Sequence, residues 1–372
     1  MKKLLNKENK ETLKWLAIVF LIWRLSLSLF AFLGVKFILL RPDFLGPSPW
    51  ANFDGVHYLN IAQKGYFQFE QAFFPFYPFL VRWLGRFLLK DYLFTGLMVS
   101  HLAFFLSLFL FYKLVRIDHS EKIARRSIFY LLVFPTSFFF ACFYSESLFL
   151  LLILGSFWFA RKQKWLWAGV LGAMASATRL VGIFLFPALL MEWYKSKGKT
   201  KKEKLKNILS LVLIGFGLFV YMAYLHQTTG DPLYFFHVQP LFGAQRSGSR
   251  LILLYQVFWR YLKMVLTTKW DVLYFAVWLE ALTSLLFLIL AALTYLWLPL
   301  SYFVFLVLAY LAPTLTGTFS SMPRYVLVLF PGFIILARLA GKYPKLKMVY
   351  SIISGILLII STILFTRGYW IG

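Results

Sequence analysis

Long apolar stretches separated by short basic breaks restrict the fold of this chain more than any other feature. Of the 372 residues, 61% are hydrophobic, compared with roughly 45–50% in soluble domains. A water-soluble fold of this length cannot bury so much apolar surface, so the sequence predicts a multi-pass membrane protein. We expect helical spans, because the apolar stretches run well beyond the roughly 10-residue alternating strands of membrane barrels.

The formal net charge of +25 does not indicate nucleic-acid binding. Lys and Arg cluster in the breaks between apolar stretches, as the positive-inside rule expects for cytoplasmic connections. The densest cluster is KSKGKTKKEKLK at 195–206. The basic N-terminus precedes an apolar stretch too long for a cleavable signal core. We therefore expect a cytoplasmic N-terminus and a retained first span.

The sequence predicts an all-α polytopic membrane protein with about 11 transmembrane helices in a single domain, 1–372. The first extracytoplasmic loop is expected at 41–90, with an interfacial helix at 76–89, and a second interfacial helix is expected at 251–268. The predicted single spans are 13–39, 92–113, 127–144, 146–160, 207–226, 272–297 and 348–366, and two short hairpins are predicted at 165–193 and 300–340.

The hairpin at 165–193 predicts a cavity. Basic residues flank it on both sides, so the chain must go out and return within these residues. At 1.5 Å per residue, each arm covers only about 20 Å of a hydrocarbon core roughly 30 Å thick. Helices this short are tolerated around a wet or protein-lined cavity. We expect the cavity to open on the extracytoplasmic side, with Arg179 near the turn.

Five charged residues fall at or near membrane depth in this topology: Arg24, Asp54, Glu146, Arg179 and Arg324. A charge at the centre of a span costs roughly 2.5–3.5 kcal/mol on insertion scales, so each needs a partner or a function. Asp54 lies in ANFDGVHYLNIAQKGY (51–66), just after the first span. We expect these residues to gather beside the cavity.

Structural roles are open alternatives for most of them. Arg24 is also explained by a carboxylate partner that fixes packing. Glu146, in the SES sequence, is also explained as a helix cap. Arg324 is also explained by snorkelling to lipid phosphates, and Asp54 by capping a helix that starts at Gly55.

Arginines, one loop carboxylate and abundant aromatic residues favour sugar transfer from a lipid phosphate. Arginine binds phosphate in bidentate fashion, and a carboxylate can act as general base toward an acceptor hydroxyl. An arginine can also stabilise a departing phosphate without a metal. No His, Asp and Glu set has the spacing of metal ligands, so neither a tight metal site nor another cofactor is expected. His57 is better explained by a structural or substrate-orienting role.

Several segments resemble the PIG-V type mannosyltransferases, which add the second mannose in GPI-anchor assembly, and their prokaryotic relatives. The two most specific lie within 52–83: NFDGVHYLNIAQKGY and AFFPFYPFLVRW. The others are FPTSFFFACFYSESLFL (134–150), SATRLVG (176–182), GDPLYFFHVQ (230–239) and SMPRYVLVLFP (321–331). Phe53 stands where the family usually has Trp.

This resemblance implies a GT-C fold and inverting, metal-independent transfer on the outer face. The donor would be a polyprenyl- or dolichyl-phosphate mannose, and the acceptor a hydroxyl of a glycolipid or glycan. Asp54, in the first extracytoplasmic loop, matches the family's catalytic base, and Glu146, Arg179 and Arg324 match its other motif residues. The implied location is the plasma membrane in a prokaryote, or the endoplasmic reticulum in a eukaryote.

The remaining roles are physical assignments. We expect the donor phosphate to meet Arg179 or Arg324. Trp50, His57 and Tyr58 are expected to shape the sugar site, and Arg24, Glu146 and Tyr325 complete the predicted substrate-binding set.

Two other classes of function are open. A lipid-linked sugar transporter or flippase would use the same cavity charges for binding and alternating access, although the inverted repeats typical of transporters are not visible. Another GT-C reaction, such as oligosaccharide ligation or protein glycosylation, would use the same fold with a different acceptor.

Overall fold

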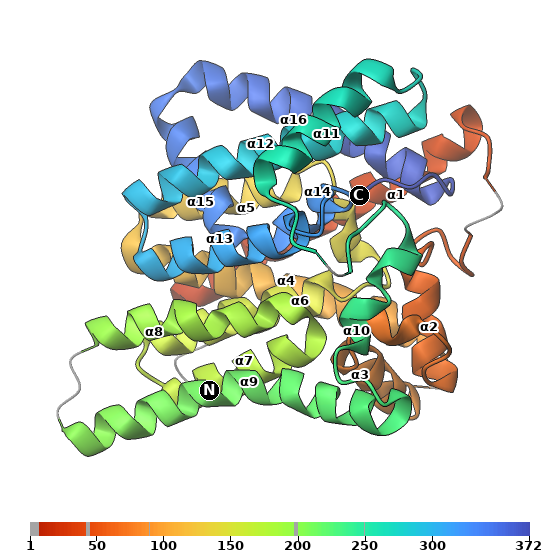
Figure 1. Cartoon of the computed structure of the whole chain (residues 1–372). Coiled ribbons are helices and arrows are strands. Elements are labelled where there is room, and N and C mark those ends of the chain that lie inside the picture. Colours follow the sequence, from red (N-terminus) through yellow and green to blue (C-terminus); the bar gives the residue numbers. More distant parts are fainter. Residues whose placement is uncertain (1–6, 42–44, 89, 197–199, 249) are drawn as a thin grey trace.

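The structure is a computed structural model that describes residues 7–41, 45–88, 90–196, 200–248 and 250–372. Every regular element within these ranges is a helix (Figure 1). Five helices are long and apolar enough to cross a membrane: α1 (Lys7–Phe37), α4 (Tyr92–Asp118), α9 (Lys201–Thr229), α12 (Val272–Trp297) and α16 (Pro344–Thr366). The bent pair Met322–Val328 and Phe330–Lys342, with an angle of 84°, makes a sixth if it is one span.

Shorter helices lie between the long ones. The first half of the chain contains α2 (Asp54–Lys64), α3 (Phe76–Gly85), α5 (Glu121–Leu132), α6 (Glu146–Arg161), α7 (Trp165–Thr178) and α8 (Leu185–Lys195). The second half contains α10 (Tyr234–His237), α11 (Leu254–Thr267), α13 (Leu300–Thr314), α14 (Met322–Tyr325) and α15 (Phe330–Lys342). The 3₁₀ turns are η3 (Glu70–Ala72), η4 (Ser137–Ala141), η5 (Leu180–Phe184), η6 (Gln239–Phe242) and η7 (Val326–Val328).

Local capping explains several of these bounds. Asp271 accepts a hydrogen bond from the Tyr274 backbone N–H at 3.1 Å, so α12 begins at Val272, where the sequence predicted it. Asp91 caps α4 in the same way, through the Phe94 N–H at 2.9 Å. The C-terminal end of α9 is set by Gly230, because its backbone φ of 77° is one that glycine adopts readily. Capping side chains thus fix the start of two spans, and a glycine in the left-handed conformation fixes the end of a third.

One predicted span is wrong as a continuous helix. Over 127–144, α5 ends at Leu132 and the buried 3₁₀ turn η4 follows before α6 begins at Glu146. Pro135 causes the break, because it has no N–H to donate and disfavours helical backbone at the residue before it. The turn predicted near ATRLVG is found, since α7 ends at Thr178 and η5 begins at Leu180. The total of about eleven spans stays a prediction.

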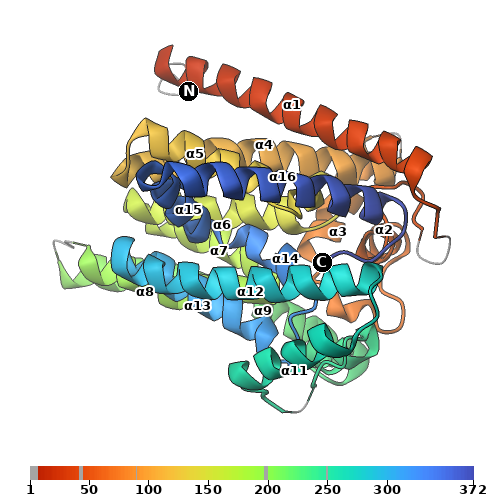
Figure 2. The ribbon, with the colours of Figure 1, turned by 90° about the horizontal axis from the view of Figure 1, so that it is seen from above.

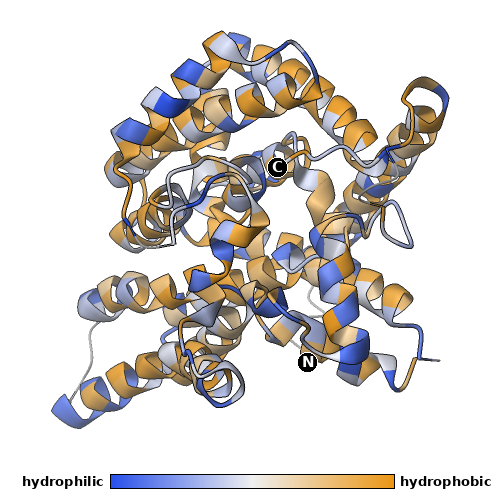
Figure 3. Ribbon diagram, turned by 45° about the vertical axis from the view of Figure 1, so that its right-hand side comes forward, coloured by the Kyte–Doolittle hydropathy of each residue, from blue (hydrophilic) through white to orange (hydrophobic). Residues whose placement is uncertain are grey.

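The exposed faces of the long helices are apolar, as expected for an integral membrane protein. Leu21, Ile22 and Leu25 on α1 are more than half exposed, and a soluble protein rarely exposes such a continuous apolar surface. Figure 3 shows hydrophobic residues along the helices and hydrophilic residues mostly at helix ends, including the beginning of α9. Together these features identify the chain as an integral membrane protein.

The helices pack in a bundle with its loops gathered at two ends. Helix α7 packs most extensively on α9, and α6 lies between α4 and α7. Figure 2 shows α1 along one side of the bundle, next to α4 and α16, with α11 on the far side. In Figure 1 the last residues of α8 and the first residues of α9 lie at one end, and α2, α3 and α10 lie at the other. The candidate site is at this second end, away from the Lys-rich break 195–206.

Small residues allow α7 and α9 to approach closely, and this contact can be tested. A Cβ added at Gly217 of α9 would lie 1.9 Å from the Ala173 carbonyl oxygen of α7. We therefore expect Gly217→Ala to separate the helices and to destabilise the protein by about 1–3 kcal/mol. The measurement is thermal unfolding in detergent.

Gly215, on the same helix, is the matched control. A Cβ there meets only Ile183 Cδ1, at 3.8 Å. Because alanine has the higher helix propensity, Gly215→Ala is expected to unfold at the wild-type temperature or slightly above it. Equal melting temperatures for the two variants would contradict the close packing of α7 on α9.

Candidate active site

A cavity of 810 Å³ lies between the two halves of the bundle. Its lining comes from the helices α2, α6, α7, α10, α11, α12, α13 and α14, from the 3₁₀ turns η3, η5, η6 and η7, and from the loops around them. Seven of the nine predicted site residues line it: Asp54, His57, Tyr58, Glu146, Arg179, Arg324 and Tyr325. The fold thus brings to one place residues that lie far apart in the sequence.

Three ion pairs link four side chains on the cavity wall. Asp54 Oδ2 lies 2.5 Å from Arg324 Nη1. The Nε of the same arginine lies 3.4 Å from Glu146 Oε1, and Arg179 Nη1 pairs with that same oxygen. The order of charges is therefore Asp54, Arg324, Glu146, Arg179. This arrangement holds the four side chains in fixed positions, because moving any one of them leaves a buried charge without its partner.

The backbone on both sides of the Asp54–Arg324 pair has unusual geometry. Phe53, directly before Asp54, has a φ of 53°, and Ser321, three residues before Arg324, has a φ of 68°. Non-glycine residues seldom adopt positive φ, and such strain concentrates at functional sites. The Phe53 ring packs against Phe365 and Trp370 at centroid distances of 5.7 and 5.0 Å. These contacts hold the turn that places Asp54 in the cavity.

The capping alternatives for the two carboxylates are not what the structure shows. Helix α2 begins at Asp54 itself, and no side chain caps its first turn. The Asp54 carboxylate reaches Arg324 instead. Helix α6 likewise begins at Glu146 without a side-chain cap, and the Glu146 carboxylate reaches two arginines. Both carboxylates therefore serve the cavity and not a helix end.

Arg324 does not snorkel to lipid. Its residue surface is 5% exposed. Its guanidinium lies over the rings of Tyr144 and Tyr325, at 5.4 and 5.3 Å from the ring centroids. Cation–π contacts of this kind hold a buried guanidinium in one orientation. The snorkelling alternative is thus wrong.

His57 and Tyr58 line the cavity one helical turn beyond Asp54. His57 Nδ1 lies 3.1 Å from Glu70 Oε1, and its ring stacks on Phe73 at 5.0 Å. The Tyr58 hydroxyl lies 2.9 Å from Ser145 Oγ, next to Glu146. Tyr58 therefore links α2 to the start of α6, and Glu70 fixes the orientation of the His57 ring.

Arg24 and Trp50 are not part of the cavity lining. The Arg24 guanidinium lies 4.5 Å from the centroid of the Trp50 ring. Its Nε lies 2.8 Å from His101 Nε2, and its Nη1 donates to Ser28 Oγ at 2.6 Å. Among the described residues its partner is thus a histidine, where the packing alternative expected a carboxylate. This cluster connects α1 with α4 and with the loop before Asp54.

Sequence reasoning missed four ionisable residues of the cavity: Arg246, Arg260, Tyr261 and Glu280. Glu280 had a signal, because it is a charged residue inside the predicted span 272–297. Its carboxylate accepts a hydrogen bond from the Tyr261 hydroxyl at 2.5 Å. Burial, followed by the nearby Glu280 carboxylate, raises the pKa of Tyr261 well above its usual value. The phenol therefore keeps its proton and acts as the donor.

No metal site is apparent in the part of the chain that the structure describes. There, no group of three or more His, Cys, Asp or Glu side chains is placed to hold a metal ion.

The geometry at the cavity can now be compared with known families. The family model for the mannosyltransferases of the PIG-V type matches residues 44–236. The chain belongs to this family. The matched segment is more than half of the chain and includes three residues of the candidate site, Asp54, Glu146 and Arg179. A search of curated proteins finds no match to the chain.

Membership of the PIG-V family agrees with the resemblance seen in the sequence. It identifies the chain as a membrane glycosyltransferase of a mannosyltransferase family. Arg246, Arg260, Glu280 and Arg324 lie beyond the matched segment. For Arg246, Arg260 and Glu280, the place at the site therefore rests on the structure alone.

Proposed function

We propose that the protein transfers a sugar, with mannose as the first candidate, from an isoprenoid phosphate to an acceptor hydroxyl on a glycolipid or glycan. The observation that carries the proposal is the Asp54–Arg324 ion pair on the wall of a cavity that contains polar, charged and aromatic groups. The proposed fold is of the GT-C type, and the reaction is inverting and needs no metal.

Asp54 is the proposed general base. Arg324 holds its Oδ2, and no described residue hydrogen-bonds its Oδ1, which leaves that oxygen for the acceptor. The acceptor hydroxyl gives its proton to Asp54 while its oxygen attacks the anomeric carbon of the sugar. The bond between that carbon and the phosphate oxygen breaks, and the isoprenoid phosphate leaves with the electron pair. A positioned base of this kind contributes about 10²–10⁴-fold to the rate.

Unused hydrogen-bonding atoms in the wall suit a sugar. Glu146 Oε2 and Ser321 Oγ are buried and have no hydrogen-bond partner within the described ranges. A buried polar atom left without a partner costs about 1–3 kcal/mol. A sugar hydroxyl that donates to Glu146 Oε2 would recover this cost. His57 and Tyr58 line the same cavity.

The proposed site faces the extracytoplasmic side. It lies at the end of the bundle away from the Lys-rich break 195–206 (Figure 1), which the positive-inside rule places in the cytoplasm. An isoprenoid donor would then enter sideways from the outer leaflet.

The test is a donor and acceptor screen with purified protein. Radiolabelled polyprenyl-phosphate mannose is incubated with candidate acceptors, and the products are identified by mass spectrometry. We expect donor consumption together with an acceptor that gains one hexose. Movement of intact donor across proteoliposomes without consumption would instead establish a flippase, and no consumption with any lipid-phosphate sugar would exclude the proposed reaction.

A further inference from the structure

The cavity has more cations than carboxylates able to neutralise them. Its described lining carries four arginines and three carboxylates. Arg179 and Arg324 are paired with Glu146 and Asp54. The third carboxylate, Glu280, accepts hydrogen bonds from a tyrosine hydroxyl and a backbone N–H. No described carboxylate forms an ion pair with either of the other two arginines, Arg246 and Arg260.

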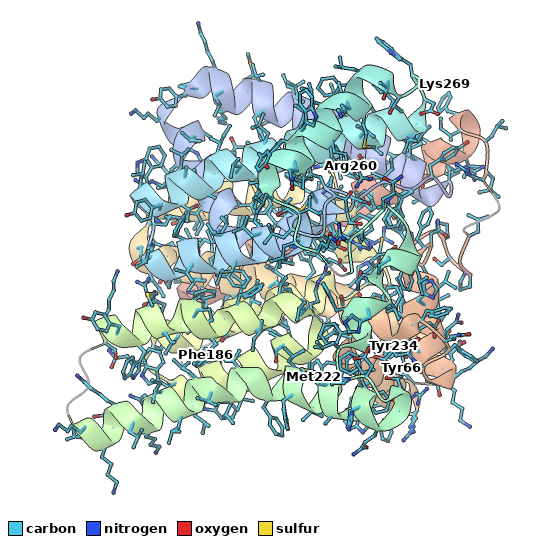
Figure 4. All side chains as sticks on the ribbon, viewed as in Figure 1. Tyr66, Phe186, Met222, Tyr234, Arg260 and Lys269 are labelled. Carbon is cyan, nitrogen blue, oxygen red and sulfur yellow. The ribbon has the colours of Figure 1, made fainter. Side chains whose placement is uncertain are left out.

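Arg260 has a positioning role for the loop that carries Arg246. From α11, its Nη1 donates to the Gly317 carbonyl at 2.9 Å. Its Nη2 donates to the Ala244 carbonyl at 3.2 Å and to Gln245 Oε1 at 3.0 Å. In Figure 4 Arg260 lies above Tyr66 and Tyr234, on the side of the molecule where α11 lies. Arg260 thus ties the 244–246 loop to the loop that follows α13.

The backbone before Arg246 is held in a rare conformation. Gly243, Ala244 and Gln245 have φ values of 79°, 57° and 50°. Two of these residues are not glycine, and such a run of positive φ persists only when its surroundings hold it in place. Arg260 supplies that support through its bonds to both of them. The result is a half-buried Arg246 guanidinium on the cavity lining, and no described side chain hydrogen-bonds it.

An apolar wall lies beside these two arginines. Met264 of α11 and Leu273, Ala276 and Val277 of α12 line the same cavity. The opposite face of α11 exposes Trp259, Leu262 and Leu266, as expected for a helix at the membrane surface. A cationic group next to an apolar wall fits a ligand with an anionic head and a hydrocarbon chain.

We propose that Arg246, held by Arg260, binds the phosphate of the isoprenoid-phosphate donor, with the isoprenoid chain along the α11–α12 wall. The inference rests on the proposed function. It assigns the phosphate to Arg246 in place of Arg179 or Arg324, because those two arginines are already paired with carboxylates. Arg246 lines the same cavity as Tyr325, the neighbour of Arg324. The sugar on this phosphate would then reach toward Asp54. The described lining has one arginine more than it has carboxylates. The donor is a phosphodiester between the sugar and the isoprenoid, and its single negative charge matches this surplus.

The test measures binding of phytanyl phosphate, a short saturated isoprenoid phosphate, to the full-length protein in detergent. Arg246→Ala is expected to weaken this binding by about 10- to 100-fold, since hydrogen bonds to charged groups are the stronger ones. Arg246→Lys keeps the charge without the fork geometry and is expected to lose less. Phytanol, which lacks the phosphate, is expected to bind all variants equally.

Arg250→Ala is the matched control, because Arg250 is exposed in the same loop and does not line the cavity. It is expected to bind phytanyl phosphate as the wild type does. Melting temperatures show whether each variant is folded, and Arg246→Lys carries the test if Arg246→Ala does not fold. Inorganic phosphate and phosphatidylglycerol are used as competitors, and both are expected to compete poorly.

Each outcome decides between the subsite and the proposed function. Wild-type binding in folded Arg246→Ala, together with weak binding in Arg179→Ala or Arg324→Ala, would overturn the subsite and leave the proposed function standing. Equal competition by inorganic phosphate or phosphatidylglycerol would overturn the assignment to the donor. The proposed function is judged separately, by whether the wild type consumes a polyprenyl-phosphate sugar.

Discussion

Asp54→Asn is expected to lower the rate of sugar transfer by about 10²–10⁴-fold, because an amide cannot take the proton of the acceptor hydroxyl. The substitution keeps the size of the side chain and an oxygen that accepts the bond from Arg324. Arg324 also keeps Glu146 at 3.4 Å, so its buried guanidinium still faces a carboxylate. The measurement is the initial rate of donor consumption under saturating donor and acceptor.

Asp54→Glu and the melting temperature are the controls for this variant. Glutamate keeps a base but moves it by one methylene group, so partial activity is expected. Asp54→Asn is expected to melt close to the wild-type temperature and to bind phytanyl phosphate normally. Near-wild-type turnover in a well-folded Asp54→Asn protein would remove Asp54 from the chemistry.

Arg324→Met is expected to be the most destabilising single change at the site. Arg324 is almost fully buried and pairs with two carboxylates. Removing one partner of a buried ion pair costs about 3–5 kcal/mol, because a charge is left behind without compensation. Transfer is also expected to stop, since Asp54 loses the contact that positions it. The measurements are thermal unfolding and donor consumption.

The double variant separates these two effects. Arg324→Met combined with Asp54→Asn removes the unpaired charge, so part of the lost stability is expected to return while activity stays absent. Arg338→Met on α15 is the control, because Arg338 bonds the Trp297 carbonyl and has no carboxylate partner among the described residues. Equal destabilisation by Arg324→Met and Arg338→Met would contradict a special role for the buried pair.

Much of the architecture follows from the sequence, because apolar length and capping residues are local properties. Helix α12 was predicted with the correct bounds, since Asp271 marks its start. The beginning of α1 was placed too late, because its first residues, KENKET, are polar yet helical. The span at 127–144 was wrong because Pro135 and the buried η4 turn interrupt it. Periodicity and hydropathy do not register a break within an apolar stretch.

The site could be predicted only in part, for physical reasons. The cost of a charge in the membrane identified Asp54, Glu146, Arg179 and Arg324, and the fold brings these four into contact. The same rule applies to Glu280, which was overlooked. No local pattern could show that residues 54 and 324 form an ion pair, because that contact joins two short helices, α2 and α14, that lie far apart in the sequence.

Arg246 illustrates a second limit. In the sequence it is one of several polar residues in the loop 227–250, and nothing distinguishes it from Arg250. Only the positive φ values before it and the bonds from Arg260 show why it lies on the cavity lining. Arg24 shows the reverse case, since a charge that was notable in the sequence lies outside the cavity lining.

The most direct test of Asp54 as the base in a single displacement is the anomeric configuration of the transferred sugar. Using the acceptor found in the screen, proton NMR compares the glycosidic linkage of the product with that of the donor. We predict complete inversion, with one isoprenoid phosphate released for each sugar transferred. Retention of configuration would contradict the account, because Asp54 or another residue would then have to attack the sugar itself.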